Sequence, residues 1–138
     1  MSSIYPIKGI FTGLTPREKL FLASHPHLVG TIRHDAEKAL AEARRQFPGG
    51  GQHNGPADAF RHCYWSALLA RDIGPDNALS FTNAHEAYGS NPAGEKAMDL
   101  HNNGVGVGIG GANPSATDDD LIQACRDAID AGQLQLAP

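Results

Sequence analysis

The sequence contains no run rich in lysine or arginine. Its 15 acidic residues outnumber its 11 basic residues and give a net charge of −4. Proteins that grip a nucleic-acid backbone rely on clustered lysine and arginine to displace counterions from the phosphates. The composition therefore argues against such a binding protein. It does not exclude an enzyme that meets a nucleic acid through a metal ion.

Long apolar stretches and a targeting signal are also missing. No apolar run reaches the roughly 20 residues that a helix needs to cross a bilayer. Residues 1–6 lack the basic start and the apolar core of a secretory signal peptide. We therefore expect a chain without a transmembrane segment that is made in the cytoplasm, and any export would use a route that needs no cleaved signal.

Cysteine is scarce. Cys63 and Cys125 are the only two, and their spacing fits no CxxC pattern. Both fall in helical segments with apolar neighbours, which favours two buried free thiols. A disulfide between the two helices is the alternative if the protein acts outside the cytoplasm.

Apolar residues recur at three- and four-residue steps along most of the 138 residues, and caps and breakers separate the segments. This pattern predicts an all-α fold, a compact single-domain bundle of about five to six helices. We expect residues 1–14 to form an N-terminal arm and residues 15–138 to form one helical domain. The expected helices cover residues 15–25, 28–47, 56–72 and 76–88, one that begins near residue 93, and one that residue 117 caps and residue 132 ends.

Glycine alternates with valine or isoleucine between residues 104 and 111. Glycine at every second position weakens a strand, and no other segment would pair with one here. We therefore expect the preceding helix to continue through this stretch, with glycines that allow another helix to approach closely, and to fray near Gly110.

Three short clusters, at residues 53–65, 84–86 and 98–103, together hold four of the seven histidines and the only tryptophan. Asp58 and His62 are four residues apart, so on a helix they point the same way. The carboxylate could orient the imidazole for general-base chemistry, or both could bind a metal ion. A buried hydrogen bond that ties helices together is the structural alternative.

The second and third clusters add further polar groups. His85 and Glu86 are adjacent, so one is expected to face the site while the other packs or orients its neighbour. Asp99 with Asn102 or Asn103 could offer oxygen ligands to a hard cation. The alternative is that the asparagines cap the helix.

Burying so many polar groups on three consecutive helices is costly unless they serve a common site. Helices joined by short loops pack as neighbours, so we expect the clusters to meet in one cleft. The predicted catalytic residues are Asp58, His62, His85, Glu86 and Asp99. The predicted substrate-binding residues are Arg61, Trp65, Asn102 and Asn103, and the candidate ligands of a divalent metal are Asp58, His62, Asp99 and His101.

The runs DAFRHCYW (58–65), AHE (84–86) and MDLHNN (98–103), followed by Val105 and Gly106, resemble an uncharacterised all-helical bacterial domain family. That family is found in secreted effectors and at the C-terminal ends of polymorphic toxins. The resemblance implies an antibacterial effector, exported by a type VI-like injection machine to act in a target cell. It also implies a cognate immunity protein as partner.

Three functional hypotheses follow. The first is a hydrolase of the bacterial cell envelope, acting on peptidoglycan or lipid, in which Asp58 orients His62 as general base while Glu86 and Asp99 supply acid or metal-ligand functions. The second is a metal-dependent nuclease or phosphodiesterase. The third is a non-enzymatic binding or membrane-perturbing module, motivated by the small residues of the 104–111 stretch.

Overall fold

The computed structural model describes residues 14–49, 55–85 and 93–137. This part of the chain forms six α-helices and one 3-10 turn, and it contains no strand. The elements are α1 (Pro16–Ser24), η3 (Pro26–Leu28), α2 (Val29–Gln46), α3 (Gly55–Ile73), α4 (Pro75–His85), α5 (Ala93–Ala112) and α6 (Asp118–Asp130). The predicted all-α bundle is confirmed.

Local chemistry sets the helix ends. Thr15 and Glu18 form a reciprocal capping box at the start of α1, and Thr117 and Asp120 form another at the start of α6. Gly74, between α3 and α4, adopts a φ of 90°, in the left-handed region where a residue with a side chain would be strained. The predicted boundaries agree to within one or two residues, except that residues 86–88 lie outside the described ranges.

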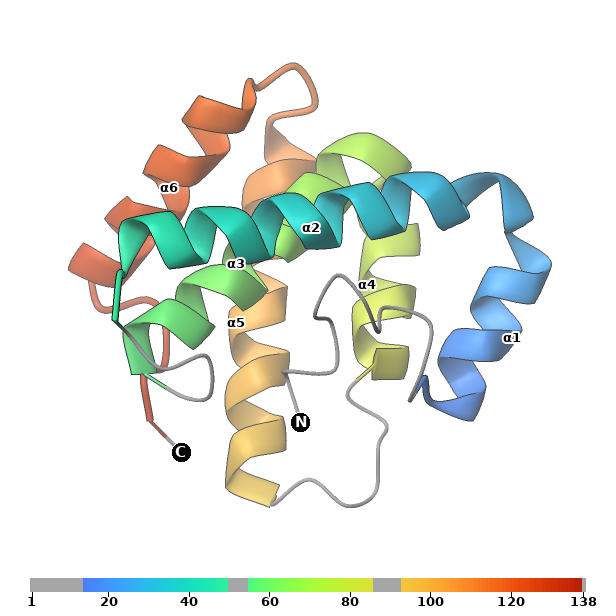
Figure 1. Cartoon of the computed structure of the whole chain (residues 1–138), viewed down its shortest axis with the longest axis horizontal. Coiled ribbons are helices and arrows are strands. Elements are labelled where there is room, and N and C mark those ends of the chain that lie inside the picture. The colour runs from blue at the N-terminus through green and yellow to red at the C-terminus, as the bar shows by residue number, and fades with distance from the viewer. Residues whose placement is uncertain (1–13, 50–54, 86–92, 138) are drawn as a thin grey trace.

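Helix α3 is the centre of the molecule. Every residue from 57 to 70 is buried, so α3 presents no solvent face over four turns. It packs against α2, α4, α5 and α6, and its contact with α5 is the most extensive between any two described helices. In Figure 1, α2 lies across the front of α3, while α1 and α6 occupy opposite ends of the bundle. Any charged group on the first turns of α3 must therefore find its partners inside the protein.

Glycines allow the close approach of α5 to α3. A Cβ atom on Gly106 would lie 2.2 Å from the carbonyl oxygen of Cys63, and one on Gly110 would lie 2.0 Å from that of Ala67. The prediction of a continued helix with contact glycines is confirmed. The fraying expected near Gly110 is wrong, because this packing keeps α5 helical as far as Ala112.

Neither α5 nor any other helix in the described ranges is long and apolar enough to cross a membrane.

Candidate metal and acid–base centre

Three acidic and imidazole side chains converge where α3 crosses α5. The Nε2 atom of His62 lies 3.6 Å from Oδ1 of Asp58 and 3.4 Å from Oδ1 of Asp99. One potential ligand atom from each of the three residues lies within 4.8 Å of the other two. The exposed fractions are 1% for Asp58, 3% for His62 and 3% for Asp99, so the group that was expected to lie in a cleft is a buried cluster.

The other side of the His62 ring is fixed by hydrogen bonds. Nδ1 of His62 lies 3.1 Å from Oδ1 of Asn103, and Ser66 donates its hydroxyl hydrogen to the same oxygen at 3.3 Å. An amide oxygen can only accept a hydrogen bond, so Nδ1 carries the proton. In neutral His62 the lone pair of Nε2 is consequently directed at the two carboxylates.

Arg61 compensates part of the negative charge. Its Nη2 atom donates to Oδ1 of Asp58 at 2.9 Å, and both side chains are buried. Loss of this partner would leave a buried carboxylate without its compensating charge and would strongly destabilise the folded state. Arg61, a predicted substrate-binding residue, is therefore engaged by Asp58 inside the protein.

The two distances from His62 to the carboxylates suit a divalent cation, and all three ligand atoms lie within 4.8 Å of one another. Ligand bonds of about 2.1 Å to a tetrahedral ion place neighbouring ligand atoms about 3.4 Å apart, close to the 3.4 and 3.6 Å distances here. Oδ1 of Asp99 is buried and forms no hydrogen bond with the described residues. A ligating histidine usually donates its second ring N–H to an oxygen acceptor, as His62 does to Asn103. The described group could therefore hold a metal ion.

Burial disfavours charge throughout the cluster when no cation is bound. It lowers the pKa of His62, and the attraction of Asp99 and Asp58 only partly offsets this effect. Burial likewise raises the pKa of Asp99 above its ordinary value, against the opposing influence of His62. Both shifts disfavour the charged forms that a metal-free ion pair between these two residues would need.

A second histidine–carboxylate pair joins α1 to α4. Nδ1 of His85 lies 3.2 Å from Oε2 of Glu18, and Oε1 of Glu18 accepts from the backbone N–H of Thr15. The Thr15 hydroxyl in turn donates to the carbonyl of Ala84 at 2.7 Å. Because the Glu18 carboxylate accepts a hydrogen bond from Nδ1–H, neutral His85 has its lone pair on Nε2. This is how a carboxylate orients a general-base histidine.

Sequence reasoning missed Glu18 as a site residue. The capping box accounts for only one of its two carboxylate oxygens, and nothing in the local sequence indicates that the second reaches helix α4. The available signal was the position of Glu18, four residues before the apolar Leu22, on the buried face of α1.

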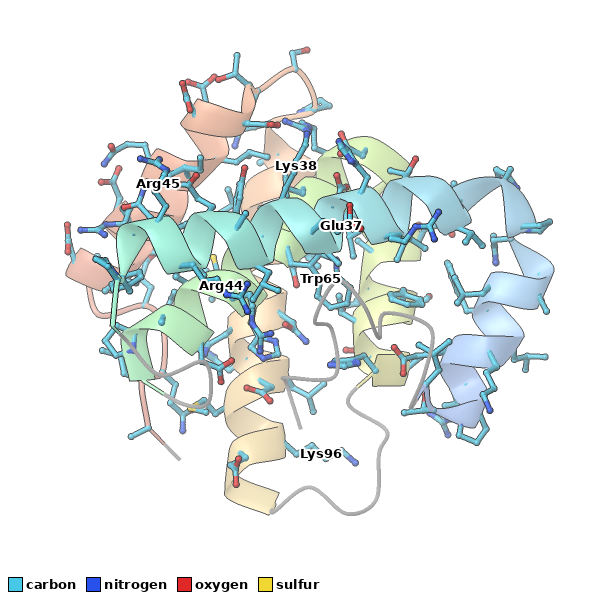
Figure 2. All side chains as sticks on the ribbon, in the orientation of Figure 1. Glu37, Lys38, Arg44, Arg45, Trp65 and Lys96 are labelled. Carbon is cyan, nitrogen blue, oxygen red and sulfur yellow. The ribbon has the colours of Figure 1, made fainter. Side chains whose placement is uncertain are left out.

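Trp65 packs against the imidazole of His85. Its ring meets the His85 ring edge-on at a centroid distance of 5.7 Å and the Phe81 ring at 5.9 Å. In Figure 2 it lies beneath α2, whereas Arg44 and Arg45 project from the surface of that helix. Positive charge on His85 lowers the pKa of His62, so the two histidines lie within electrostatic range of each other. Trp65 is thus part of the packing around His85 and Phe81.

Two predicted residues of α5, His101 and Asn102, do not join the cluster. His101 is exposed and its Nε2 bonds the carbonyl of Gln133, because it follows Asp99 by two residues and points to another side of α5. Asn102 is buried, but its side-chain amide donates to the Gln135 carbonyl and accepts from the Gln135 N–H, so it anchors the C-terminal segment. Glu86 lies outside the described residues.

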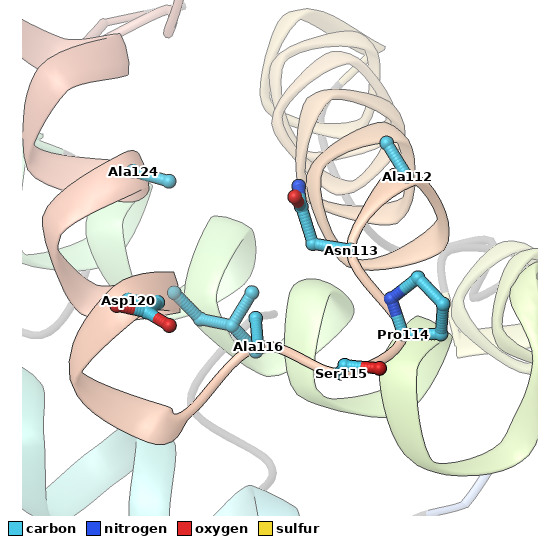
Figure 3. Close-up of a pocket in the computed structure, with 8 residues that line it drawn as sticks. Ala112, Asn113, Pro114, Ser115, Ala116, Asp120 and Ala124 are labelled. Atoms are coloured by element: carbon cyan, nitrogen blue, oxygen red, sulfur yellow. The ribbon is translucent and has the colours of Figure 1, made fainter.

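The pocket in Figure 3 lies elsewhere, between the end of α5 and the start of α6. Asn113, Ser115, Asp120 and Ala124 are among its lining residues, and no member of the two histidine–carboxylate pairs takes part. The candidate centre is therefore defined by its polar contacts and not by this hollow.

Comparison with known proteins identifies the family of the chain. The profile of the family described as Domain of unknown function (DUF6973) matches residues 19–133. The chain belongs to this family. The match includes Asp58, His62, His85 and Asp99, whereas Thr15 and Glu18 lie just before it. No solved structure matches the chain.

Proposed function

We propose that this DUF6973 domain is a divalent-cation-dependent hydrolase, with Asp58, His62 and Asp99 as the cation ligands. The observation that carries the proposal is their convergence from two helices at distances that suit an ion of tetrahedral geometry. A buried cluster of two carboxylates and an imidazole needs compensating positive charge, and Arg61 supplies only part of it.

The cluster of Asp58, His62 and Asp99 and the Glu18–His85 pair suggest separate roles. A bound cation of this kind lowers the pKa of water and so supplies a nucleophile near neutral pH. Asn103 and Ser66 hold the His62 ring in the ligand tautomer, and Arg61 holds the Asp58 carboxylate by a hydrogen bond. His85, oriented by Glu18, is the better candidate for general base, because its Nε2 lone pair is set by a carboxylate on Nδ1. This reassigns the base role expected for His62.

The proposed substrate class is the bacterial cell envelope, either peptidoglycan or lipid. The net charge of −4 and the absence of a lysine- or arginine-rich run count against a nucleic acid as the substrate. The resemblance of the three sequence motifs to effector domains supports a secreted antibacterial role, delivery by a type VI-like route and a neutralising immunity protein. These associations belong to the proposal.

A metal-dependent nuclease or phosphodiesterase is the second candidate. The same ligand set suits phosphodiester cleavage, and the buried Arg61 guanidinium could support a developing phosphate charge. The third hypothesis, a membrane-perturbing module, loses its motivating observation, because Gly106 and Gly110 are used in the packing of α5 on α3.

Activity assays decide between these candidates. Purified protein is incubated with isolated sacculi, phospholipid vesicles, plasmid DNA and total RNA, each with added Zn²⁺ or Mn²⁺ and with EDTA. We expect soluble fragments or free lipid products, lost in EDTA and reduced at least about 100-fold by Asp99→Asn and by Glu18→Gln. Exposed residues supply the matched controls, Asp130→Asn and His34→Ala, which should retain full activity.

Each result has a clear meaning. Cleavage of DNA or RNA alone would replace the envelope substrate with the second candidate. Intact substrates in all four assays, with folded protein and with either metal, would contradict the proposed hydrolase.

A further inference from the structure

The two cysteines meet at the interface between α3 and α6. Both are free thiols, both have an exposed fraction of 0%, and their Sγ atoms lie 3.1 Å apart. Cys63 lies one residue after His62, on the helix that carries most of the candidate centre, and Cys125 lies midway along α6. A disulfide bond of about 2 Å therefore requires the sulfurs to approach by only about 1 Å.

The folded protein protects this pair from solution chemistry. No oxidant or reductant can touch sulfurs that have no exposed surface. The hydrogen bond between the two thiols and the burial of the site raise the pKa of Cys125 far above its ordinary value. Thiol–disulfide exchange needs a thiolate, so exchange in the native state is suppressed both sterically and chemically.

We propose that Cys63 and Cys125 are a disulfide-forming pair whose redox state is fixed while the chain folds. A chain that folds in an oxidising compartment carries a covalent bond between α3 and α6, and a chain that folds in a reducing compartment carries two thiols. After folding, each form keeps the state in which it was made. This inference is independent of the proposed hydrolase activity.

The bond can be formed with a small disulfide such as oxidised glutathione. The thiolate of one cysteine attacks the glutathione disulfide, which releases one glutathione thiol and leaves a mixed disulfide on the protein. The second cysteine then attacks the protein sulfur and releases the other glutathione thiol. Two electrons pass from the cysteines to glutathione, and the two cysteine protons end on the two glutathione thiols.

The bond would lock the central helix to the last one. Cys63 and Cys125 are separated by nearly half the chain, so the cross-link closes a long loop and removes much of the freedom of the unfolded state. It would stabilise the native packing around α3 without touching Asp58, His62 or Asp99.

The experiment starts from fully reduced protein. One sample is unfolded in guanidinium and refolded by dilution into a glutathione redox buffer, while a second is kept folded in the same buffer. We expect the refolded sample to be monomeric, about 2 Da lighter by mass spectrometry, and higher in Tm by roughly 10 °C. The folded sample should keep both thiols, and alkylation should be at least about 100-fold slower in it than in guanidinium.

The Cys125→Ala variant is the control, and its Tm should be the same after either treatment. The wild-type comparison needs no variant, so poor folding of Cys125→Ala leaves the test intact. Glutathione adducts or intermolecular dimers in place of the 2 Da loss, or a lower Tm for the bonded form, would overturn the proposed pair. Oxidation of the folded sample as fast as the unfolded chain would overturn the claim that folding fixes its state.

Discussion

Individual buried charges in this protein are compensated in different ways. Asp58 pairs with Arg61, and Glu18 satisfies one oxygen with the Thr15 N–H and the other with His85. Asp35 on α2 forms no ion pair with a lysine, arginine or histidine among the described residues. It lies beside another carboxyl group, that of Asp72. Two carboxyl groups that share a buried site cannot both ionise without cost. Asp35 is therefore where the stability of the fold should depend most on pH.

The first prediction concerns Asp35. Burial and the neighbouring Asp72 raise its pKa to about 8, with Lys38 and Arg71 opposing the shift. Because the folded state keeps a proton that the unfolded state has lost, stability is greatest below the unfolded pKa and falls as pH rises toward about 8. Asp35→Asn keeps a neutral group there at every pH. As the pH rises from about 5 to about 8, the free energy of unfolding of the variant should therefore increase by roughly 1–3 kcal/mol relative to that of the wild type.

Urea unfolding of both proteins at the two pH values measures this gain. Asp130→Asn, an exposed carboxyl on α6, should show the same pH dependence as the wild type. A constant difference between Asp35→Asn and the wild type from pH 5 to 8 would show that Asp35 is ionised in the folded protein at both values.

At the scale of helices, the contact between α3 and α5 decides the geometry of the centre. His62 and Asp58 lie on one helix, Asp99 and Asn103 on the other. The helices approach as closely as they do because Gly106 and Gly110 have no Cβ atoms. The glycines, which have no reactive groups of their own, thus set the distance between the ligands.

The second prediction tests this contact with alanine. Gly106→Ala or Gly110→Ala places a Cβ atom against the α3 backbone, so each should reduce the free energy of unfolding by about 1–3 kcal/mol or more. Gly104 and Gly108 lie on the same helix, but a Cβ atom added at either position would meet nothing within 4 Å. Alanine there should raise stability by up to about 1 kcal/mol, because it is the better helix former.

Chemical denaturation of the four single variants gives the comparison. The opposite signs of the two pairs are the outcome to look for. Equal destabilisation by all four variants would mean that α5 depends on glycine for its backbone conformation and not for close packing on α3.

For the whole molecule, the sequence was sufficient to predict the helices but not how they assemble. Capping residues and breakers such as Thr15, Thr117 and Gly74 act locally, so the helix ends follow from short-range chemistry. The central place of α3 follows from its many small and apolar residues, which are buried on all sides of the helix. The small error at the end of α5 arose because Gly110 packs on α3, a contact that local propensity does not include.

The same division applies to the candidate centre. The i, i+4 relation of Asp58 and His62 and the presence of Asp99 in the cluster were predictable from helical phase. The contacts of His101 and Asn102 with the C-terminal segment were not predictable, because they depend on where residues 133–135 lie. The Glu18–His85 pair joins residues 67 positions apart, and no pattern in the sequence connects them.

The central claim is that the molecule binds one divalent cation through Asp58, His62 and Asp99, and a metal titration followed by thermal unfolding tests it most directly. At a free ion concentration of about 100 times Kd, binding to the folded state alone adds about 2.7 kcal/mol to the free energy of unfolding. Metal-free wild-type protein should therefore take up one equivalent of Zn²⁺ or Mn²⁺ and rise in Tm by several degrees. Asp130→Asn should behave in the same way, whereas Asp99→Asn should lose both responses. A folded wild-type protein that binds no cation, or an Asp99→Asn variant that binds it equally well, would contradict the claim.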